Sequence, residues 1–401
     1  MNPFLQPRLV HLADTLRTHI ARGELAGAVT LLWRHGEVHI ETIGAQDRER
    51  GVPMQRDTLF RIASMTKPVT AVAAMILVEE GKLRLDDPVD QLLPELADRK
   101  VLRQMDGPLD DTVPAHRPIT LRDLLTFRLG VGMMLDSPNY PIHQAMKEAG
   151  IFLAPLPPSP HAPDAWIRQL GTLPLMHQPG ERWMYGAGSD VAGVLIARAA
   201  GMRLEDFFQE RIFAPLGMKD TAFYAPEDKV HRLAQAYVRR RPDGLVIYDD
   251  GGAWTRPPVF PMGSAGLVST VDDYLAFARM MLNFGTHDAN GTDRPTRILS
   301  RASVELMTTD HLTQAQKDVS PFASHFWDHR GWGFGVSMIT SPDRVAPTPG
   351  RYGWDGGFGT SWFSDPRENM VGMLMTQRVG NLMMSSLYRD FWTLVYQAIE
   401  R

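Results

Sequence analysis

The chain has 401 residues, of which 44 % are hydrophobic and 22 % charged, a balance typical of a globular protein with a sizeable buried core. The formal net charge is −4 and no lysine- or arginine-rich block is found, which argues against nucleic acid as a partner. The chain contains no cysteine, which excludes disulfides, thiolate metal sites and cysteine nucleophiles. The N-terminus lacks a signal-peptide pattern and the longest apolar run is too short for a bilayer, so we expect a cytoplasmic protein without membrane insertion.

The first part of the chain predicts a helix followed by a β-hairpin. Residues 5–22 carry leucine and isoleucine at helical spacing, and the pattern ends near a glycine. Two strand-like runs follow, residues 28–33 and residues 38–43, and the His35-Gly36 pair between them favours a tight turn. We therefore expect two antiparallel strands close to the N-terminus.

The middle of the chain, residues 81–264, is rich in proline and in short helical patterns, which predicts a mostly helical region. Strand-like runs return after it. They predict one antiparallel sheet assembled from residues 1–80 and 265–401, with the helical region inserted. The helices expected in the middle region span residues 121–127, 163–170, 190–200 and 204–212. The elements expected later are a helix over 271–283, strands over 332–338, 361–363 and 370–375, and a closing helix over 384–399.

A Ser-x-x-Lys tetrapeptide, from Ser64 to Lys67, opens the longest apolar helical run of the chain. At this spacing the hydroxyl and the amine fall on one helix face, one turn apart. Serine needs a base to become a nucleophile, and a lysine is a base only if its pKa is depressed. The first turn of a helix disfavours an ammonium, which supplies such a cause. The alternative is that Ser64 simply caps the helix, although a capping box would place Glu or Gln at the third position.

Tyr185 is a second candidate, because it follows a Pro-Gly turn and is followed by small residues that open a helix near Ser189 or Asp190. Its phenol can therefore project into a cleft. Near a lysine, a tyrosine can act as a phenolate base, since the cation favours the charged form. The alternative is a half-buried aromatic side chain with one hydrogen bond.

The third candidate segment is the glycine-rich stretch 352–360. Glycines this dense weaken a strand unless something requires close backbone approach. One interpretation is a strand edge whose N–H near Gly357 completes an oxyanion hole with the Ser64 N–H. The other is a glycine-rich hairpin turn.

Taken together and in this order, the three segments resemble the motifs of the serine β-lactamase and penicillin-binding protein superfamily, among class C-like members most closely the family VIII carboxylesterases. The resemblance covers nearly the whole chain. It implies an α+β, β-lactamase-like fold with the active site in the cleft between the sheet part and the helical part. It also implies Ser64 as the acylated nucleophile, Lys67 as its partner and Tyr185 as the proton relay. Further stretches that carry the resemblance are 57–64, 119–126, 212–221 and 263–270.

Two departures from the β-lactamase pattern bear on the substrate. The second motif, Tyr-x-Asn in β-lactamases, ends here in Ala187, so the amide that holds a β-lactam side chain is missing. For the third motif we prefer the register 354–356, similar to the Trp-Gly-Gly of family VIII esterases, in which an acid would repel anionic substrates. The alternative register, Arg351-Tyr352-Gly353, would restore a cation. The residues expected to bind substrate are Trp183, Trp354, Asp355, Gly356 and Phe358.

The sequence therefore predicts two-step acyl transfer on an uncharged small-molecule ester, with no metal and no organic cofactor. The segment around Ser264 lacks the leading glycine of a Gly-x-Ser-x-Gly elbow. His35 and His39 lie on the expected hairpin, where their spacing does not make a metal pair. Other functions left open are a β-lactamase, a D-amino-acid peptidase or an acyltransferase of the same superfamily, and a non-catalytic penicillin-binding or scaffold module. The oligomeric state is not predicted.

Overall fold

The computed structural model describes residues 3–133, 140–151, 158–240, 244–248, 251–288, 295–346, 348–380 and 385–400. Within them, eight strands form an antiparallel sheet in the order β12-β13-β14-β15-β16-β1-β2-β3. The order places strands from both ends of the chain in one sheet, as expected. The strands are β1 (Gly27–Arg34), β2 (Glu37–Asp47), β3 (Val52–Pro53), β12 (Arg330–Trp332), β13 (Ser337–Ile339), β14 (Tyr352–Gly356), β15 (Thr360–Asp365) and β16 (Met370–Met375).

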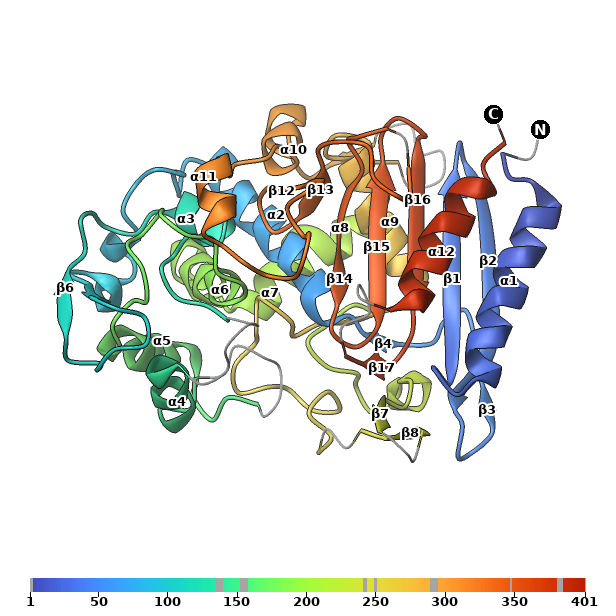
Figure 1. Cartoon of the computed structure of the whole chain (residues 1–401), viewed down its shortest axis with the longest axis horizontal. Helices are drawn as coiled ribbons and strands as arrows, with labels where there is room; N and C mark the ends of the chain where they lie inside the picture. The colour runs from blue at the N-terminus through green and yellow to red at the C-terminus, as the bar shows by residue number, and fades with distance from the viewer. Residues whose placement is uncertain are drawn as a thin grey trace.

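Strand β1 joins the two ends of the chain because it pairs with β2 on one side and with β16 on the other. The expected tight turn connects β1 to β2, and its two residues have positive φ angles, 49° at His35 and 92° at Gly36. The termini meet at the same edge of the molecule (Figure 1), where Phe4 bridges Ile399.

One face of the sheet is covered by α1 (Gln6–Ala21) and α12 (Ser386–Gln397), which lie side by side in Figure 1. Alternate strand residues such as Leu32 and Phe363 pack with them in one apolar cluster. The Ser385 hydroxyl accepts a hydrogen bond from the Tyr388 N–H and so fixes the start of α12. The expected start of this helix, residue 384, lies outside the described residues.

The opposite face of the sheet packs against α2 (Thr66–Glu79) and α9 (Val271–Leu282). Residues 66–77 of α2 are all buried, which explains why this helix is apolar on every side. α6 (Ala187–Ala200) lies beside α2 and is buried from residue 187 to residue 196. The Ser-x-x-Lys segment therefore lies between the sheet and the helical part.

The remaining described elements frame this core. The other helices are α3 (Leu121–Leu125), α4 (Pro141–Glu148), α5 (Pro163–Thr172), α7 (Leu204–Phe208), α8 (Ala214–Leu216), α10 (Arg301–Met307) and α11 (Gln314–Asp318). The small sheets are β4 (Phe60–Arg61) with β9 (Val268–Ser269), β5 (Lys100–Leu102) with β6 (Thr112–Pro114), β10 (Thr286–His287) with β11 (Thr296–Arg297), and β17 (Arg378–Val379) with β7 (Tyr237–Arg240) and β8 (Gly244–Ile247).

The α+β class is confirmed, but two local expectations differ from the structure. The single strand expected over 332–338 is a hairpin of β12 and β13, because Gly335 between them has a φ of 69°. The helix expected over 204–212 is confirmed, since α7 begins at Leu204 and continues as a π-helical turn over 209–213. Strands β5 to β8 also interrupt the region that was expected to be mostly helical.

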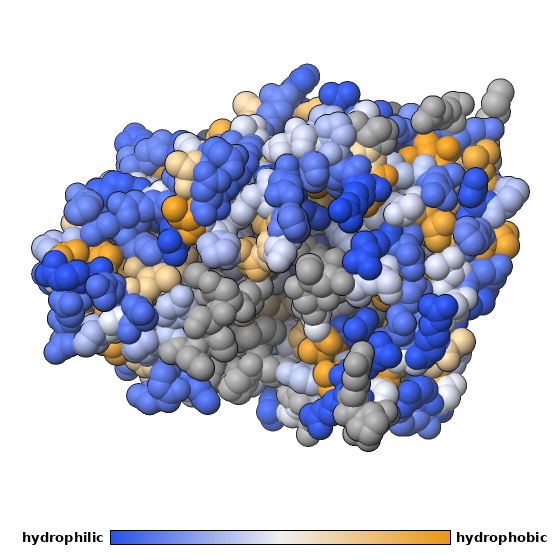
Figure 2. Space-filling view, viewed as in Figure 1, coloured by the Kyte–Doolittle hydropathy of each residue, from blue (hydrophilic) through white to orange (hydrophobic). Residues whose placement is uncertain are grey.

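Among the described residues, no helix is long and apolar enough to cross a membrane. The face shown in Figure 2 is mostly hydrophilic, and its apolar residues lie in separate small groups. The large apolar side chains are instead concentrated in the core on both sides of the sheet.

Candidate active site

Ser64 lies in a single 3₁₀ turn, η1 (Ala63–Met65), that leads directly into α2. Ala63 has a φ of 43°, a left-handed conformation that costs a non-glycine residue about 1–3 kcal/mol and persists when its surroundings fix it. Neither η1 nor α2 has a side-chain hydrogen bond at its N-cap. Ser64 is therefore not a helix cap, and its hydroxyl remains available for other contacts.

Strand β14 holds the Ser64 turn in place through close backbone approach. A Cβ on Gly356 would clash with the Ile62 carbonyl, so this position requires glycine. The Thr360 hydroxyl also donates to the Ile62 carbonyl at 3.2 Å. From the other side, the Tyr274 hydroxyl of α9 donates to the Met65 carbonyl at 2.9 Å. These contacts supply the fixed surroundings that the strained backbone before Ser64 needs.

Lys67 points back at Ser64. Its Nζ donates to the Ser64 Oγ at 3.0 Å and to the Ser264 carbonyl at 2.7 Å, and the side chain is buried. Burial lowers the pKa of Lys67 below its ordinary value, and the nearby Asp190 carboxylate opposes this shift. Desolvation, rather than the helix terminus, is the main cause of the low pKa of Lys67. The arrangement favours a neutral amine in contact with the hydroxyl.

Tyr185 meets the same hydroxyl from a separate segment. Its backbone is fixed by a hydrogen bond from the Met133 N–H to its carbonyl at 2.7 Å. The phenol oxygen accepts from the Trp354 Nε1 at 2.7 Å and also interacts with the Ser64 hydroxyl. Burial raises the pKa of Tyr185, so the phenol is neutral at ordinary pH. The phenolate base that the sequence analysis expected is therefore disfavoured, and a neutral proton relay is favoured.

An aromatic cluster surrounds the Tyr185 ring. The ring centroids of Phe127, Trp183, Phe322 and Trp354 lie 5.8, 5.8, 5.1 and 5.7 Å from that of Tyr185. Such contacts hold the phenol in one orientation. Trp183 is buried and packs against Tyr185, and its expected contact with substrate stays a prediction.

Strand β14 presents different chemistry on its two faces, because successive side chains alternate. Trp354 contacts Tyr185, whereas Asp355 accepts a hydrogen bond from the Ser361 hydroxyl at 2.5 Å on the opposite face. The expectation that Asp355 faces the substrate is therefore wrong. Arg351 also lies on that face, where it pairs with Asp343, so the alternative register brings no cation to Ser64.

Gly357 and Phe358 form the turn after β14. Gly357 is exposed, and a Cβ there would meet nothing within 4 Å, which leaves open space beside its backbone. The Phe358 ring is buried against Trp254 and Tyr248, at centroid distances of 5.2 and 5.9 Å. Phe358 therefore supports the wall behind Ala63, in the same apolar cluster, and its expected contact with substrate stays a prediction.

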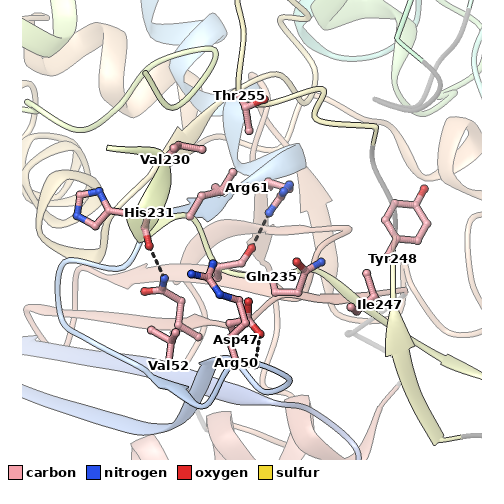
Figure 3. A pocket seen from close by; sticks show the side chains of 13 residues that line it. Asp47, Arg50, Val52, Arg61, Val230, His231, Gln235, Ile247, Tyr248 and Thr255 are labelled. Atoms are coloured by element: carbon pink, nitrogen blue, oxygen red, sulfur yellow. Dashed lines mark hydrogen bonds between the residues drawn. The ribbon is translucent and has the colours of Figure 1, made fainter. Parts of the chain in front are cut away.

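A cavity of about 500 Å³ borders this wall (Figure 3) and is lined by Gln46, Arg50, Arg61, Gln235 and Tyr248 among others. Arg61 of β4 lines it. The Arg61 guanidinium donates to the Ala234 carbonyl at 2.7 Å and lies over the rings of Trp254 and Phe358. Ser64, Lys67 and Tyr185 do not line this cavity.

Two residues of the site were not predicted as functional, Asp190 and Ser264. The Ser264 N–H donates to Asp190 Oδ1 at 2.9 Å, and its carbonyl accepts from Lys67. The sequence analysis treated Asp190 as part of a helix start, although α6 begins earlier, at Ala187. One signal was present, since Asp190 is the one charged residue in the stretch 187–196, whose other residues are apolar or small. A charge at such a position is rare unless it has a partner.

A serine, a lysine one helical turn away and a tyrosine from a distant segment, placed beside strand β14 of an antiparallel sheet, define the class of serine enzymes that resemble β-lactamases and penicillin-binding proteins. Comparison with known proteins agrees. The model of the Beta-lactamase family matches residues 12–394, and the chain belongs to this family.

Relatives within the family include proteins of different names. Protein Rv1367c of Mycobacterium tuberculosis is 42 % identical over 366 residues, which is 90 % of this chain and 88 % of that protein. Esterase EstB of Burkholderia gladioli is 31 % identical over 375 residues, 88 % of this chain and 86 % of the esterase. The solved structure of EstCE1, a hydrolase with promiscuous acyltransferase activity, has a TM-score of 0.78 and 26 % identity and covers 98 % of both chains. The resemblance to family VIII esterases is thus confirmed.

Proposed function

We propose that this protein hydrolyses uncharged carboxylic esters through an acyl-enzyme on Ser64. Its place in a family of β-lactamase-fold serine hydrolases with esterase relatives supports the reaction class. The observation that carries the proposal is the contact of a buried lysine amine with the Ser64 hydroxyl at 3.0 Å, while a neutral phenol meets the same hydroxyl. These contacts support the roles proposed for Ser64 as nucleophile, Lys67 as base and Tyr185 as relay.

The steps follow from these contacts. The Lys67 amine takes the Ser64 proton, directly or through the Tyr185 phenol, while the serine oxygen attacks the ester carbonyl carbon. The backbone N–H groups of Ser64 and Gly357 are the proposed donors to the tetrahedral oxyanion, and loss of one such donor typically costs about 10²–10³ in rate. The C–O bond then breaks, and Tyr185 passes the proton to the departing alkoxide. Water cleaves the acyl-enzyme by the same sequence, with the alcohol replaced by water.

Two features favour an ester over a β-lactam or an anionic peptide. The position of the β-lactamase amide is occupied by Ala187, and the Arg351 guanidinium is engaged with Asp343 on the far face of the sheet. The side of the site around Tyr185 is aromatic, formed by rings such as Phe322 and Trp354. An uncharged acyl group suits such surroundings because no charge is desolvated.

Acyl transfer to an alcohol is a second candidate. EstCE1 combines hydrolysis with acyltransferase activity, and the same acyl-enzyme serves both reactions. The aromatic cluster around Tyr185 gives that side of the site an apolar character, which an organic acceptor alcohol suits.

The test compares p-nitrophenyl butyrate with a chromogenic cephalosporin, using wild-type protein and Ser64→Ala. We expect a higher kcat/KM for the ester and no turnover by Ser64→Ala. With butanol added, appearance of butyl butyrate measures transfer against hydrolysis. A higher kcat/KM for the cephalosporin would contradict the ester assignment, and full activity in Ser64→Ala would contradict the nucleophile.

A further inference from the structure

Asp190 is a buried carboxylate in the first turn of α6, and it is fully inaccessible to solvent. Burying a carboxylate is costly unless it is bound by donors or faces a positive charge. The position at a helix N-terminus offsets part of this cost. The burial of the Asp190 carboxylate on an apolar helix face therefore requires a specific partner.

The backbone of Ser264 connects Asp190 to Lys67. Its N–H donates to Asp190 Oδ1 at 2.9 Å, and its carbonyl accepts from the Lys67 Nζ at 2.7 Å. The Thr70 hydroxyl, one turn further along α2, donates to the Gly263 carbonyl at 2.6 Å. A Cβ on Gly263 would clash with the Ser189 carbonyl, so the segment approaches α6 closely. Residues 263–264 are thus clamped between α2 and α6.

Asp190 is the negatively charged group that faces the Lys67 amine across residues 263–264. The two hydrogen-bond acceptors of the amine are neutral, the Ser64 hydroxyl and the Ser264 carbonyl. The charged group that acts on Lys67 is Asp190 of α6. Asp190 and Asp355 of β14 both act on Tyr185, where each raises the pKa of the phenol further. Burial raises the pKa of Asp190, and Lys67 opposes this. Among the described residues, Asp190 Oδ2 has no hydrogen-bond partner.

We propose that Asp190 is a positioning residue for Lys67, which stabilises the ammonium formed when the amine takes the Ser64 proton. Its hydrogen bond to Ser264 holds the carbonyl that orients the amine, and its charge favours the protonated amine in the transition state. The proton moves from Ser64 Oγ to Lys67 Nζ, and no other reactant is needed. A base that is itself oriented by a third group is the general arrangement of activated nucleophiles. This inference rests on the proposed function of Ser64 and Lys67.

The test is the rate of Ser64 sulfonylation by phenylmethylsulfonyl fluoride in Asp190→Asn, measured from about pH 5 to about pH 10. Asparagine keeps the shape and the acceptor for the Ser264 N–H but removes the charge. Without the charge the pKa of Lys67 falls further, so the acid limb of the rate profile moves to lower pH by about one unit. The plateau rate falls about 10-fold or more, because the ammonium loses its counter-charge.

Asp273→Asn is the matched control. Asp273 is also a buried carboxylate whose pKa burial raises to about 6, but it accepts hydrogen bonds from the Asp220 N–H and the Thr221 hydroxyl, outside the site. Its substitution leaves the acid limb in place. If Asp190 only supported the fold, the acid limb of Asp190→Asn would likewise stay in place.

The outcomes separate this inference from the proposed function. If wild-type protein is labelled at Ser64 and the acid limb of Asp190→Asn coincides with that of wild type, Asp190 has no such role, while the nucleophile assignment stands. If wild-type protein is not labelled at Ser64, the proposed function itself is wrong. Should Asp190→Asn fail to fold, Asp190→Glu carries the test: it keeps the charge, so its limb stays at or above the wild-type pH, and a downward shift contradicts the inference.

Discussion

The two faces of strand β14 both bury charged groups but treat them differently. On the α12 side, Arg351 pairs directly with Asp343, and Asp355 is hydrogen bonded to Ser361. On the Ser64 side, Lys67 and Asp190 are each hydrogen bonded to the neutral backbone of Ser264, which lies between them. Direct pairing holds both groups of an ion pair in their charged forms. A peptide group between Lys67 and Asp190 leaves the amine able to gain or lose a proton.

The pKa shifts of two aspartates express this difference. Burial acts to raise the pKa of Asp343, but Arg351 and two backbone N–H groups outweigh it and hold the pKa below its usual range. For Asp190 burial wins, and the pKa is raised. Asp343 thus stays ionised beside Arg351, whereas the pKa of Asp190 depends on the protonation state of Lys67.

The largest expected effect comes from Lys67→Met, which removes the base and keeps most of the side-chain volume. We expect kcat on p-nitrophenyl butyrate to fall by about 10³ or more, since proton transfer by a positioned group contributes about 10²–10⁴. The melting temperature reports whether the variant is folded. A folded variant with near wild-type kcat would mean that another group takes the Ser64 proton.

Arg351→Ala tests the other face. Removing one partner of a buried ion pair leaves Asp343 uncompensated, and we expect a loss of about 3–5 kcal/mol in the free energy of unfolding. The side chains of Arg351 and Asp343 are 5 % and 12 % exposed, so solvent screens the pair little. Urea unfolding measures the loss. Below the unfolding transition, kcat per folded molecule should match wild type, and a large drop in kcat would show that the two faces are coupled.

The smallest expected effect belongs to Trp354→Phe, which keeps an aromatic ring but removes the N–H that donates to Tyr185. We expect kcat to fall about 3- to 10-fold, because one neutral hydrogen bond contributes about 0.5–1.5 kcal/mol. KM should change little if the indole acts through the tyrosine. A raised KM with unchanged kcat would instead assign Trp354 to substrate binding.

The candidate chemistry was predictable from the sequence because it depends on residue types in a fixed order. Ser64 and Lys67 are three residues apart, so their contact follows from local helical geometry. The face of β14 on which Asp355 lies was also predictable from the sequence, since side chains alternate along a strand and Asp355 follows Trp354. That prediction failed because the motif was interpreted as a block rather than as alternating side chains.

What the sequence did not predict depends on long-range packing. Lys67 and Ser264 are 197 residues apart, and their contact exists because α2, α6 and the segment 263–264 are packed together. The proposed role of Asp190 depends on the same packing. The burial of Trp183 and Phe358 likewise follows from neighbours such as Phe322 and Trp254, which the motif does not name.

The central claim is that Ser64 is the group that becomes acylated. Incubation with phenylmethylsulfonyl fluoride, followed by intact-mass measurement and peptide mapping, tests it most directly. We expect one added sulfonyl group, on the peptide that contains Ser64, and none in Ser64→Ala. A label on another serine, or equal labelling of Ser64→Ala, would contradict it.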